Sequence, residues 1–441
     1  MRAPRLIAAL LACIVVPLAI VGIVAQRYEK FSPIDEAAHF DYLRRSMSFD
    51  VPIMGDEMAQ ETNDIVACTG VDLPGLVLPR CGSKAVKAEN FPGGGLSYEA
   101  QQPPLYYWTT APLAWVVEKV AGLGPLGSAR AIGGLWLALA CVALYLTGMA
   151  LKVNRGLLLA LLLFVVASPV VAYHNSIVSN DAAVLCAASF LVMVAARVHT
   201  ERKSLIGLCF GVSFAAGMIK TSLVITAGCL AVVLLLGVLA EGTWREKSLK
   251  QLLRVPYVGS ALSMGSGALL AAFLWNTFTR LTATMPLETF PVFDVLRGQD
   301  VGYQSIAREA LVFFGTLTDS YTPFVSWNPN VHQMLAVLGK VFIIGFGTAG
   351  LFASGRSWWR VSAPVALVGG YLGTFAVGVG IWRTYDMTPG LVSRYGLPVV
   401  PILLLAAAGG IRGRVQVAIA SGLFGFAGLM FLWIIVRAPM P

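Results

Sequence analysis

Long runs of apolar residues, separated by short polar connections, occupy most of this chain. A helix needs roughly 20 apolar residues to cross the hydrocarbon core of a bilayer. The runs cover residues 6–25, 128–151, 156–173, 181–197, 204–219, 222–240, 255–275, 334–353, 361–381, 395–410 and 415–436. The pattern predicts an all-α polytopic membrane protein with about 11 transmembrane helices, forming a single domain over residues 1–441.

Two longer loops interrupt the apolar pattern, at residues 27–127 and 276–332. The first loop is hydrophilic up to residue 103, and its helices are expected to be amphipathic. Its last part, residues 104–121, is apolar but contains a proline, a glutamate and a lysine. We expect this segment to form an interfacial or re-entrant helix rather than a span.

The N-terminal run, residues 6–25, follows Arg2 and Arg5. A cleaved signal peptide has this general pattern, but its apolar region is shorter than a full bilayer crossing. The length of the run favours a retained transmembrane helix.

Basic residues in short loops indicate the orientation of the helices. They gather in five connections: Lys152 with Arg155; Arg197 with Arg202 and Lys203; Arg245, Lys247, Lys250 and Arg254; Arg356 with Arg360; Arg412 with Arg414. If these loops are cytoplasmic, the helices alternate consistently and the N-terminus is also cytoplasmic. Both long loops then lie outside the cytoplasm, in a protein of the inner or plasma membrane.

Composition narrows the class of protein. Hydrophobic residues make up 57% of the 441 residues and charged residues only 12%, whereas soluble domains are about one-quarter charged. The formal net charge of +9 comes from clusters that flank apolar runs, so it reflects membrane topology and no nucleic-acid partner is expected.

The acidic residues indicate where the chemistry takes place. Of the 23 acidic residues, 12 lie in residues 27–103 and 5 in residues 276–332. The middle of each predicted span contains none, whereas ion-coupled transporters usually keep a carboxylate near the midplane. We therefore expect the polar site at the extracytoplasmic surface.

Two of the seven cysteines are candidates for a disulfide. The other five lie in apolar runs, where cysteine behaves as a small hydrophobic residue. Cys68 and Cys81 share the first hydrophilic loop, 13 positions apart, and an oxidising compartment would allow them to pair.

The segment from Ser32 to Tyr42 holds the richest set of polar residues. Ser32 followed by Pro33 suggests the start of a helix, on which Asp35 and His39 share one face. These two side chains could face a cavity, with Asp35 as a catalytic group. Alternatively, Asp35 only complements the helix dipole.

A metal site in this segment is the weaker interpretation. Glu36 and His39 have the i, i+3 spacing of two metal ligands in helical bundles. The chain has only four histidines, so a divalent metal is not favoured and no cofactor is expected.

Several cations lie at predicted extracytoplasmic ends of spans. Lys220 sits in the turn of an apolar hairpin, Arg383 on a short loop, and Arg394-Tyr395 at the start of a late span. Such cations can bind a phosphate, although snorkelling explains a lone lysine equally well. Lys340 is a weaker candidate, and Asp181 is expected only to cap a helix.

Common catalytic fingerprints are absent from the sequence. There is no HExxH, GxSxG, Walker A or dinucleotide-binding motif. The motifs therefore give no indication of ATP, nicotinamide or zinc-protease chemistry.

Four features together resemble the GT-C glycosyltransferases, in particular the protein O-mannosyltransferase and aminoarabinose-transferase group and related uncharacterised bacterial membrane proteins. They are Asp35-Glu36 with His39-Phe40, Gln102-Pro103-Pro104-Leu105-Tyr106-Tyr107, Lys220, and Arg394-Tyr395 before Pro398. Two positions depart from the family pattern: Gln102 replaces the usual histidine before the proline pair, and two residues rather than one separate Glu36 from His39.

The resemblance implies a GT-C-like architecture and transfer of a sugar from a polyprenyl-phosphate donor to a hydroxyl of a glycan, lipid or protein acceptor. Asp35 would be the base, with Glu36 positioning the acceptor or sharing that role. His39, Gln102, Lys220, Arg383, Arg394 and Tyr395 would bind substrate. The alternatives are a protein that binds or flips a polyprenyl-phosphate carrier and an assembly subunit without catalytic activity.

Overall fold

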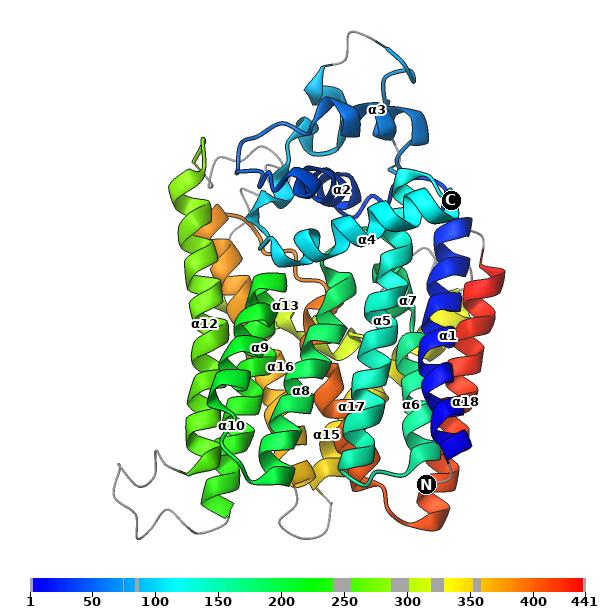
Figure 1. The fold of residues 1–441 in the computed structure, drawn as a ribbon, viewed down its shortest axis with the longest axis vertical. Coiled ribbons are helices and arrows are strands. Elements are labelled where there is room, and N and C mark those ends of the chain that lie inside the picture. Colours follow the sequence, from blue (N-terminus) through cyan, green and yellow to red (C-terminus); the bar gives the residue numbers. More distant parts are fainter. Residues whose placement is uncertain are drawn as a thin grey trace.

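The computed structural model describes residues 3–73, 75–83, 87–240, 255–286, 301–318, 329–351 and 358–438. It is a bundle of upright helices with a lobe of shorter helices on one end, called the upper end here (Figure 1). The described residues contain no strand, only the isolated bridges Phe31–Val71 and Glu57–Leu96. The all-α prediction is confirmed for these residues.

The upright helices are α1 (Ala3–Arg27), α5 (Pro125–Ala150), α6 (Arg155–Val166), α8 (Asp181–Glu201), α9 (Ile206–Ile219), α10 (Val224–Ala240), α12 (Pro256–Thr282), α15 (Pro329–Leu351), α16 (Trp358–Tyr385), α17 (Val400–Gly410) and α18 (Arg414–Arg437). Shorter helices that connect them are α7 (Pro169–His174), η5 (Thr221–Leu223), α13 (Tyr303–Glu309), η8 (Ala310–Gly315) and η9 (Ser393–Val399).

Seven of the described helices are long and apolar enough to cross a membrane, and four shorter apolar helices accompany them. Large apolar side chains also face outward along the bundle, for example Val15 in α1, Phe273 in α12 and Phe426 in α18. A soluble protein rarely exposes so large an apolar surface. The chain is therefore a multi-pass membrane protein.

The N-terminal helix is integrated into the bundle. α1 packs along α5, and Gly134 of α5 leaves room for Leu18 and Val21 of α1. The guanidinium of Arg27 donates to the carbonyls of Ile435 and Ala438. These contacts make α1 part of the bundle.

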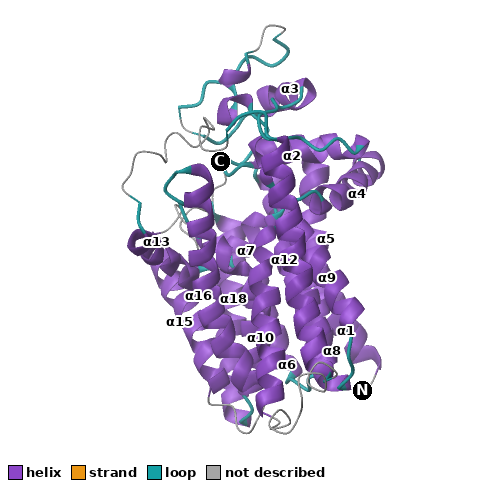
Figure 2. Cartoon of the chain, turned by 90° about the vertical axis from the view of Figure 1, so that its left-hand side faces the viewer, coloured by secondary structure: helices purple, strands orange, loops and turns teal. Residues whose placement is uncertain are grey.

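The lobe comes from the first long loop. It contains α2 (Glu36–Arg45), η1 (Ser46–Ser48), α3 (Gln60–Thr69), η2 (Ala88–Asn90), η3 (Pro92–Gly95), η4 (Tyr98–Gln101) and α4 (Leu105–Ala121). α4 lies across the upper ends of the upright helices, as expected for an interfacial segment (Figures 1 and 2). Its exposed face carries Trp115, Val116 and Val120.

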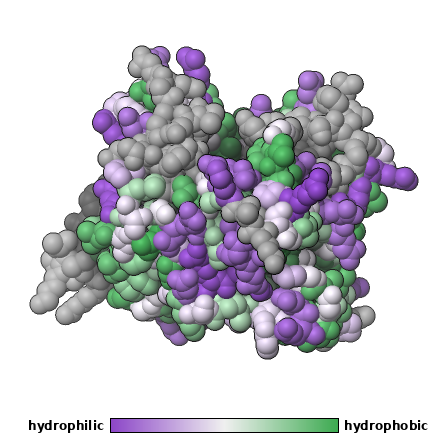
Figure 3. All heavy atoms as spheres, turned by 90° about the horizontal axis from the view of Figure 1, so that it is seen from above, coloured by the Kyte–Doolittle hydropathy of each residue, from purple (hydrophilic) through white to green (hydrophobic). Residues whose placement is uncertain are grey.

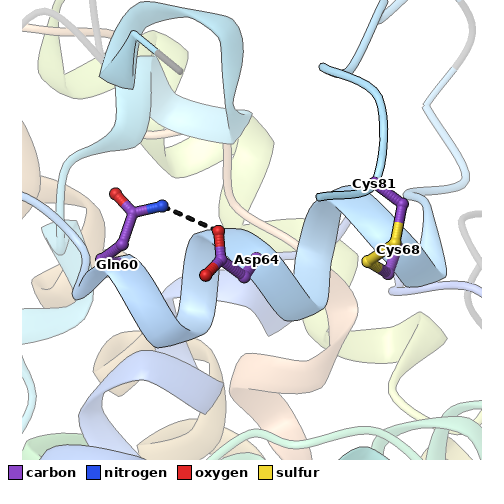
Figure 4. Close-up of a disulfide and its surroundings, with 4 residues drawn as sticks. All are labelled: Gln60, Asp64, Cys68 and Cys81. Carbon is purple, nitrogen blue, oxygen red and sulfur yellow. Dashed lines mark hydrogen bonds between the residues drawn. A yellow bond between two sulfur atoms is a disulfide. The ribbon is translucent and has the colours of Figure 1, made fainter. Parts of the chain in front are cut away.

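The predicted disulfide is present in the lobe. Cys68, near the end of α3, bonds to Cys81, and their Cα atoms are 4.5 Å apart (Figure 4). One turn earlier, the side chain of Gln60 donates to that of Asp64 at 2.7 Å. The disulfide closes the loop between Cys68 and Cys81. Within this loop, Val71 forms a backbone bridge with Phe31, which lies shortly before α2.

Parts of the predicted second loop, the whole basic cluster at residues 245–254 and Arg356 of a second cluster lie outside the described residues. α12 continues to Thr282, so the beginning of the predicted 276–332 loop is helical. The hydrophilic residues of this segment extend the helix above the bundle instead of forming a loop at once.

Candidate functional site

A polar cavity of about 530 Å³ lies at the upper end, between the lobe and the upright helices. We call it the polar cavity. Its charged or titratable lining residues are Asp35, His39, Tyr98, Glu99, Asp181, Lys220, Arg280, Tyr385, Arg394 and Tyr395. Seen from above, hydrophilic residues gather over the middle of this end (Figure 3).

Asp35 enters the cavity because α2 begins later than its sequence suggests. The expected cap at Ser32 is wrong: the first helical residue is Glu36, and Asp35 precedes it with a left-handed φ of 59°. A non-glycine residue pays to hold this conformation, which is enriched at functional sites. The Asp35 side chain makes no capping bond.

Two groups hold the Asp35 carboxylate. The hydroxyl of Tyr98 donates to Oδ1 at 3.1 Å, and Nη2 of Arg394 lies 3.5 Å from Oδ2. Burial, and then the charge of Asp35, raise the pKa of Tyr98 well above its ordinary value. The phenol therefore stays protonated and donates to Asp35, whose side chain is 33% exposed.

The two expected phosphate ligands converge on Asp181. Nζ of Lys220 lies 2.5 Å from Oδ1 of Asp181, and Nε of Arg394 lies 3.2 Å from its Oδ2. The cap of α8 is Asn180, and Asp181 is the first helical residue, so the expectation that Asp181 only caps the helix is wrong. It serves as the shared counterion of the buried Lys220 and the partly buried Arg394. A lone buried charge is expensive, and this pairing offsets that cost.

A break between α9 and η5 sends Lys220 into the cavity. The residue has extended backbone angles, φ −156° and ψ 130°, so the helix stops there. Asn180 accepts from Nζ at 3.2 Å and donates to Gln102 at 2.9 Å. Lys220 is thus tied to the loop that carries Gln102, and simple snorkelling does not describe it.

Glu99 is a second carboxyl group in the cavity. It is 4% exposed, and its Oε2 has no hydrogen-bond partner in the described part of the chain. Burial, followed by repulsion from Asp35, raises its pKa to about 8, against the opposing effect of Lys220 and Arg394. Glu99 is therefore mostly neutral at pH 7 and can donate a hydrogen bond to a ligand.

His39 stands behind Glu99. Its Nδ1 bonds to the hydroxyl of Tyr107 at 2.7 Å, and its Nε2 lies 3.3 Å from Oγ of Ser179 and 3.6 Å from Oε2 of Glu99. Burial, and then the charge of Lys220, lower the pKa of His39 to about 3. The imidazole is neutral, so the contact with Glu99 is not an ion pair at neutral pH.

Glu36 does not share the cavity with Asp35, contrary to the sequence prediction. It is fully buried and makes two bonds with Arg130, at 2.8 and 2.6 Å. The backbone N–H groups of Ser32 and Val178 donate to the same two oxygens at 2.7 and 2.8 Å. With both oxygens occupied, Glu36 is a structural link and cannot be a metal ligand.

This link depends on close packing of the backbone. A side chain at Gly133 would put its Cβ 1.8 Å from the carbonyl oxygen of Asn175. Gly133 therefore allows α5 to approach the loop that contains Val178. Arg130, one turn earlier in α5, reaches Glu36 from the same face.

Of the remaining predicted ligands, Gln102, Arg394 and Tyr395 line the polar cavity, and Arg383 does not. Arg383 is exposed and its Nη2 donates to the hydroxyl of Tyr303 at 2.8 Å. It lies beside a neighbouring cavity because α16 turns it away from Lys220. Lys340 is exposed and lines none of these cavities.

An apolar groove of about 910 Å³ continues from the polar cavity. It runs between α10 and α16, which pack against each other, and it includes the exposed side chains of Val232, Val368 and Leu372. Thr221, Ser222 and Val377 line both spaces. The polar cavity and the apolar groove thus adjoin.

Three charged residues of the cavity were not predicted from the sequence as site residues: Asp181, Glu99 and Arg280. Asp181 gave only a helix-capping signal, and Glu99 lies in a loop with several other acids. Arg280 lies in the last turn of α12, whose extension above the bundle the hydropathy pattern does not show. For Glu99, its place three residues before Gln102 was the available signal.

No group of three or more His, Cys, Asp and Glu side chains is positioned to hold a metal within the described ranges. No protein-family model, curated protein or solved structure matches the chain.

Proposed function

We propose that the protein is a glycosyltransferase that moves a sugar from a polyprenyl-phosphate donor to an acceptor hydroxyl. The adjoining polar cavity and apolar groove carry this proposal. A molecule that fits both has an anionic head and a long apolar tail, and a polyprenyl-phosphate sugar has both parts. The GT-C resemblance adds the reaction type.

The topology that goes with this function has eleven crossings. The seven long and four shorter apolar helices would supply them in a GT-C-like arrangement, with the upper end extracytoplasmic. No nucleotide sugars occur outside the cytoplasm, so the donor there would be lipid-linked. The Cys68–Cys81 disulfide also suits an oxidising compartment.

Three residues of the cavity would take part in the reaction. Asp35 removes the proton of the acceptor hydroxyl as the oxygen bonds to the anomeric carbon. The bond from that carbon to the phosphate oxygen breaks, and Lys220 with Arg394 stabilise the leaving phosphate. Attack from the opposite face gives inversion.

Turnover by the purified protein in liposomes tests the proposal. Polyprenyl phosphosugars are supplied together with an extract of envelope glycans, and sugar transfer is measured. Transfer that requires Asp35 supports the transferase. No transfer with any donor, under conditions in which the protein binds polyprenyl phosphate, would contradict it.

A carrier of polyprenyl phosphate is the second candidate, because the same cavity and groove suit lipid binding. Such a carrier would depend on Lys220 and Arg394, which face the head group, and would tolerate Asp35→Asn. A flipping assay in the same liposomes separates the two functions.

A further inference from the structure

A second cavity, also of about 530 Å³, adjoins the polar cavity. We call it the arginine cavity. Its lining residues are Arg280, Ala283, Thr284, Met285, Pro286, Arg383 and Thr384. Arg280 and Thr384 line both cavities, so a ligand of moderate size can extend from one into the other.

The two arginines of this cavity have no acidic partner within ion-pair distance among the described residues. Nη2 of Arg280 lies 3.4 Å from Oγ1 of Thr384. The guanidinium of Arg383 lies 4.4 Å from the ring centroid of Trp382. Stacking fixes the plane of a guanidinium and leaves other N–H groups available to an oxyanion.

The two arginines of this cavity are separate from the two cations that would bind the donor phosphate. Lys220 and Arg394 share Asp181 deep in the polar cavity, whereas Arg280 and Arg383 are exposed and pair with no carboxylate of the residues that the structure describes. Arg280 also lies in the last turn of α12, where a cation complements the helix dipole. The donor phosphate therefore leaves these two cations unused.

We propose that the arginine cavity binds an anionic group of the acceptor, a carboxylate or a phosphate carried on a sugar. With this group held by Arg280 and Arg383, a hydroxyl of the same acceptor extends into the polar cavity toward Asp35. That the bound anion belongs to an acceptor rests on the proposed function, but the anion site itself can be tested without donor or turnover.

The test is equilibrium binding to the full chain in nanodiscs of zwitterionic lipid, measured by ligand-observed NMR. The probes are methyl glucuronide, glucose 6-phosphate and methyl glucoside. At least one anionic probe binds about tenfold more tightly than the neutral one, and whichever binds better identifies the group. Arg280→Gln and Arg383→Gln each weaken that binding about tenfold, the usual effect of losing a charge-assisted bond.

Arg308→Gln is the matched control, because Arg308 is exposed, belongs to α13 and lines neither cavity. It leaves binding unchanged. The inference is overturned if all three sugars bind equally or if Arg280→Gln and Arg383→Gln have no effect. It is also overturned if nanodiscs containing phosphatidylglycerol abolish the binding, since the cavity then takes a lipid head group.

The two proposals fail separately. Sugar transfer without preferential binding of an anionic probe leaves the transferase standing and removes the anion site. Arginine-dependent binding of an anionic probe without any sugar transfer does the reverse.

Discussion

Nζ of Lys220 lies 2.5 Å from Oδ1 of Asp181, so that the upper ends of α9 and α8 are joined by a buried ion pair. The other oxygen of the same carboxylate lies 3.2 Å from Nε of Arg394. Lys220, Arg394 and Asp181 together carry one net positive charge, which the more exposed Asp35 offsets from 3.5 Å away. The two cations are already held in place, so an anion can bind them without first ordering their side chains.

Replacing Asp181 by Asn should destabilise the protein. The buried Lys220 would lose its counterion and the partly buried Arg394 one of its two carboxylate partners, at a cost of about 3–5 kcal/mol. We expect the apparent melting temperature in detergent to fall by several degrees and polyprenyl phosphate to restore more of it than in the unchanged protein. Asp64→Asn is the control, since Asp64 is exposed and bonds only to Gln60. Equal stability of Asp181→Asn and the control would refute the counterion role.

Asp35→Asn should nearly abolish sugar transfer while preserving donor binding. Removal of a catalytic base typically costs about 10²–10⁴ in rate, and Asn keeps the shape that accepts from Tyr98. Turnover and the binding of polyprenyl phosphate are measured side by side, with Asp64→Asn again as control. Transfer at the original rate would exclude Asp35 as the base.

Glu36→Gln should lower the free energy of unfolding. Both oxygens of Glu36 bind Arg130 and backbone N–H groups, so loss of the charge leaves Arg130 buried with a weaker partner, at a cost of about 3–5 kcal/mol. Glu61→Gln, at an exposed ion pair with Arg44, should change stability by less than about 1 kcal/mol. A catalytic role for Glu36 would instead appear as lost turnover at unchanged melting temperature.

The sequence was sufficient for the helical, membrane-spanning character of the chain and for the gathering of Asp35, Lys220 and Arg394. The apolar runs and the basic loops place each of these three residues at the predicted extracytoplasmic end of a different span. Tertiary contacts decide the rest. Asp35 and Glu36 are adjacent in sequence, but the left-handed backbone at Asp35 sends one into the cavity and the other toward Arg130.

The pairing of Asp181 with two cations could not be predicted for a related reason. An aspartate at the start of a helix can act either as a cap or as a counterion, and its sequence position is the same in both cases. Only the approach of α9 and η9 to the start of α8 distinguishes them, and a single sequence does not contain that distance. The same holds for Glu99, whose raised pKa results from burial by the lobe.

Glu99 should give the activity an alkaline limit. Its pKa of about 8 means that it is neutral at pH 7 and ionises as the pH rises. The ionised form adds a negative charge beside Asp35 and repels the phosphate of the donor, so transfer should fall above about pH 8. Glu99→Gln keeps a neutral side chain and should remove that fall. An unchanged alkaline limb in Glu99→Gln would assign it to another group.

Ionisation of Glu99 should also lower the stability of the folded protein as the pH rises. The folded pKa of Glu99 is raised from its ordinary value of 4.5 to about 8, so the folded state holds its proton more tightly than the unfolded state. Its contribution is complete below about pH 4.5 and is lost as the pH rises to about 8. Relative to the unchanged protein, Glu99→Gln should therefore gain stability over this interval, as a series of melting temperatures would show.

The apolar groove provides the last prediction, with a matched control in the same helix. Gly228 lines the groove, and a Cβ added there meets no atom within 4 Å. Gly228→Leu should therefore place an apolar side chain in the groove without a clash at its Cβ. Gly237, also in α10, has equally open surroundings and lies outside the groove, so Gly237→Leu adds the same side chain and the same gain in helix propensity.

If a polyprenyl tail occupies the groove, Gly228→Leu should raise the KM for long-chain donors about tenfold or more. A donor with a tail of only two isoprene units needs less of the groove, so its KM should change little. Gly237→Leu should resemble the unchanged protein with both donors. If Gly228→Leu and Gly237→Leu behave alike with the long-chain donor, the tail lies elsewhere, and the argument that joins the polar cavity to the apolar groove fails.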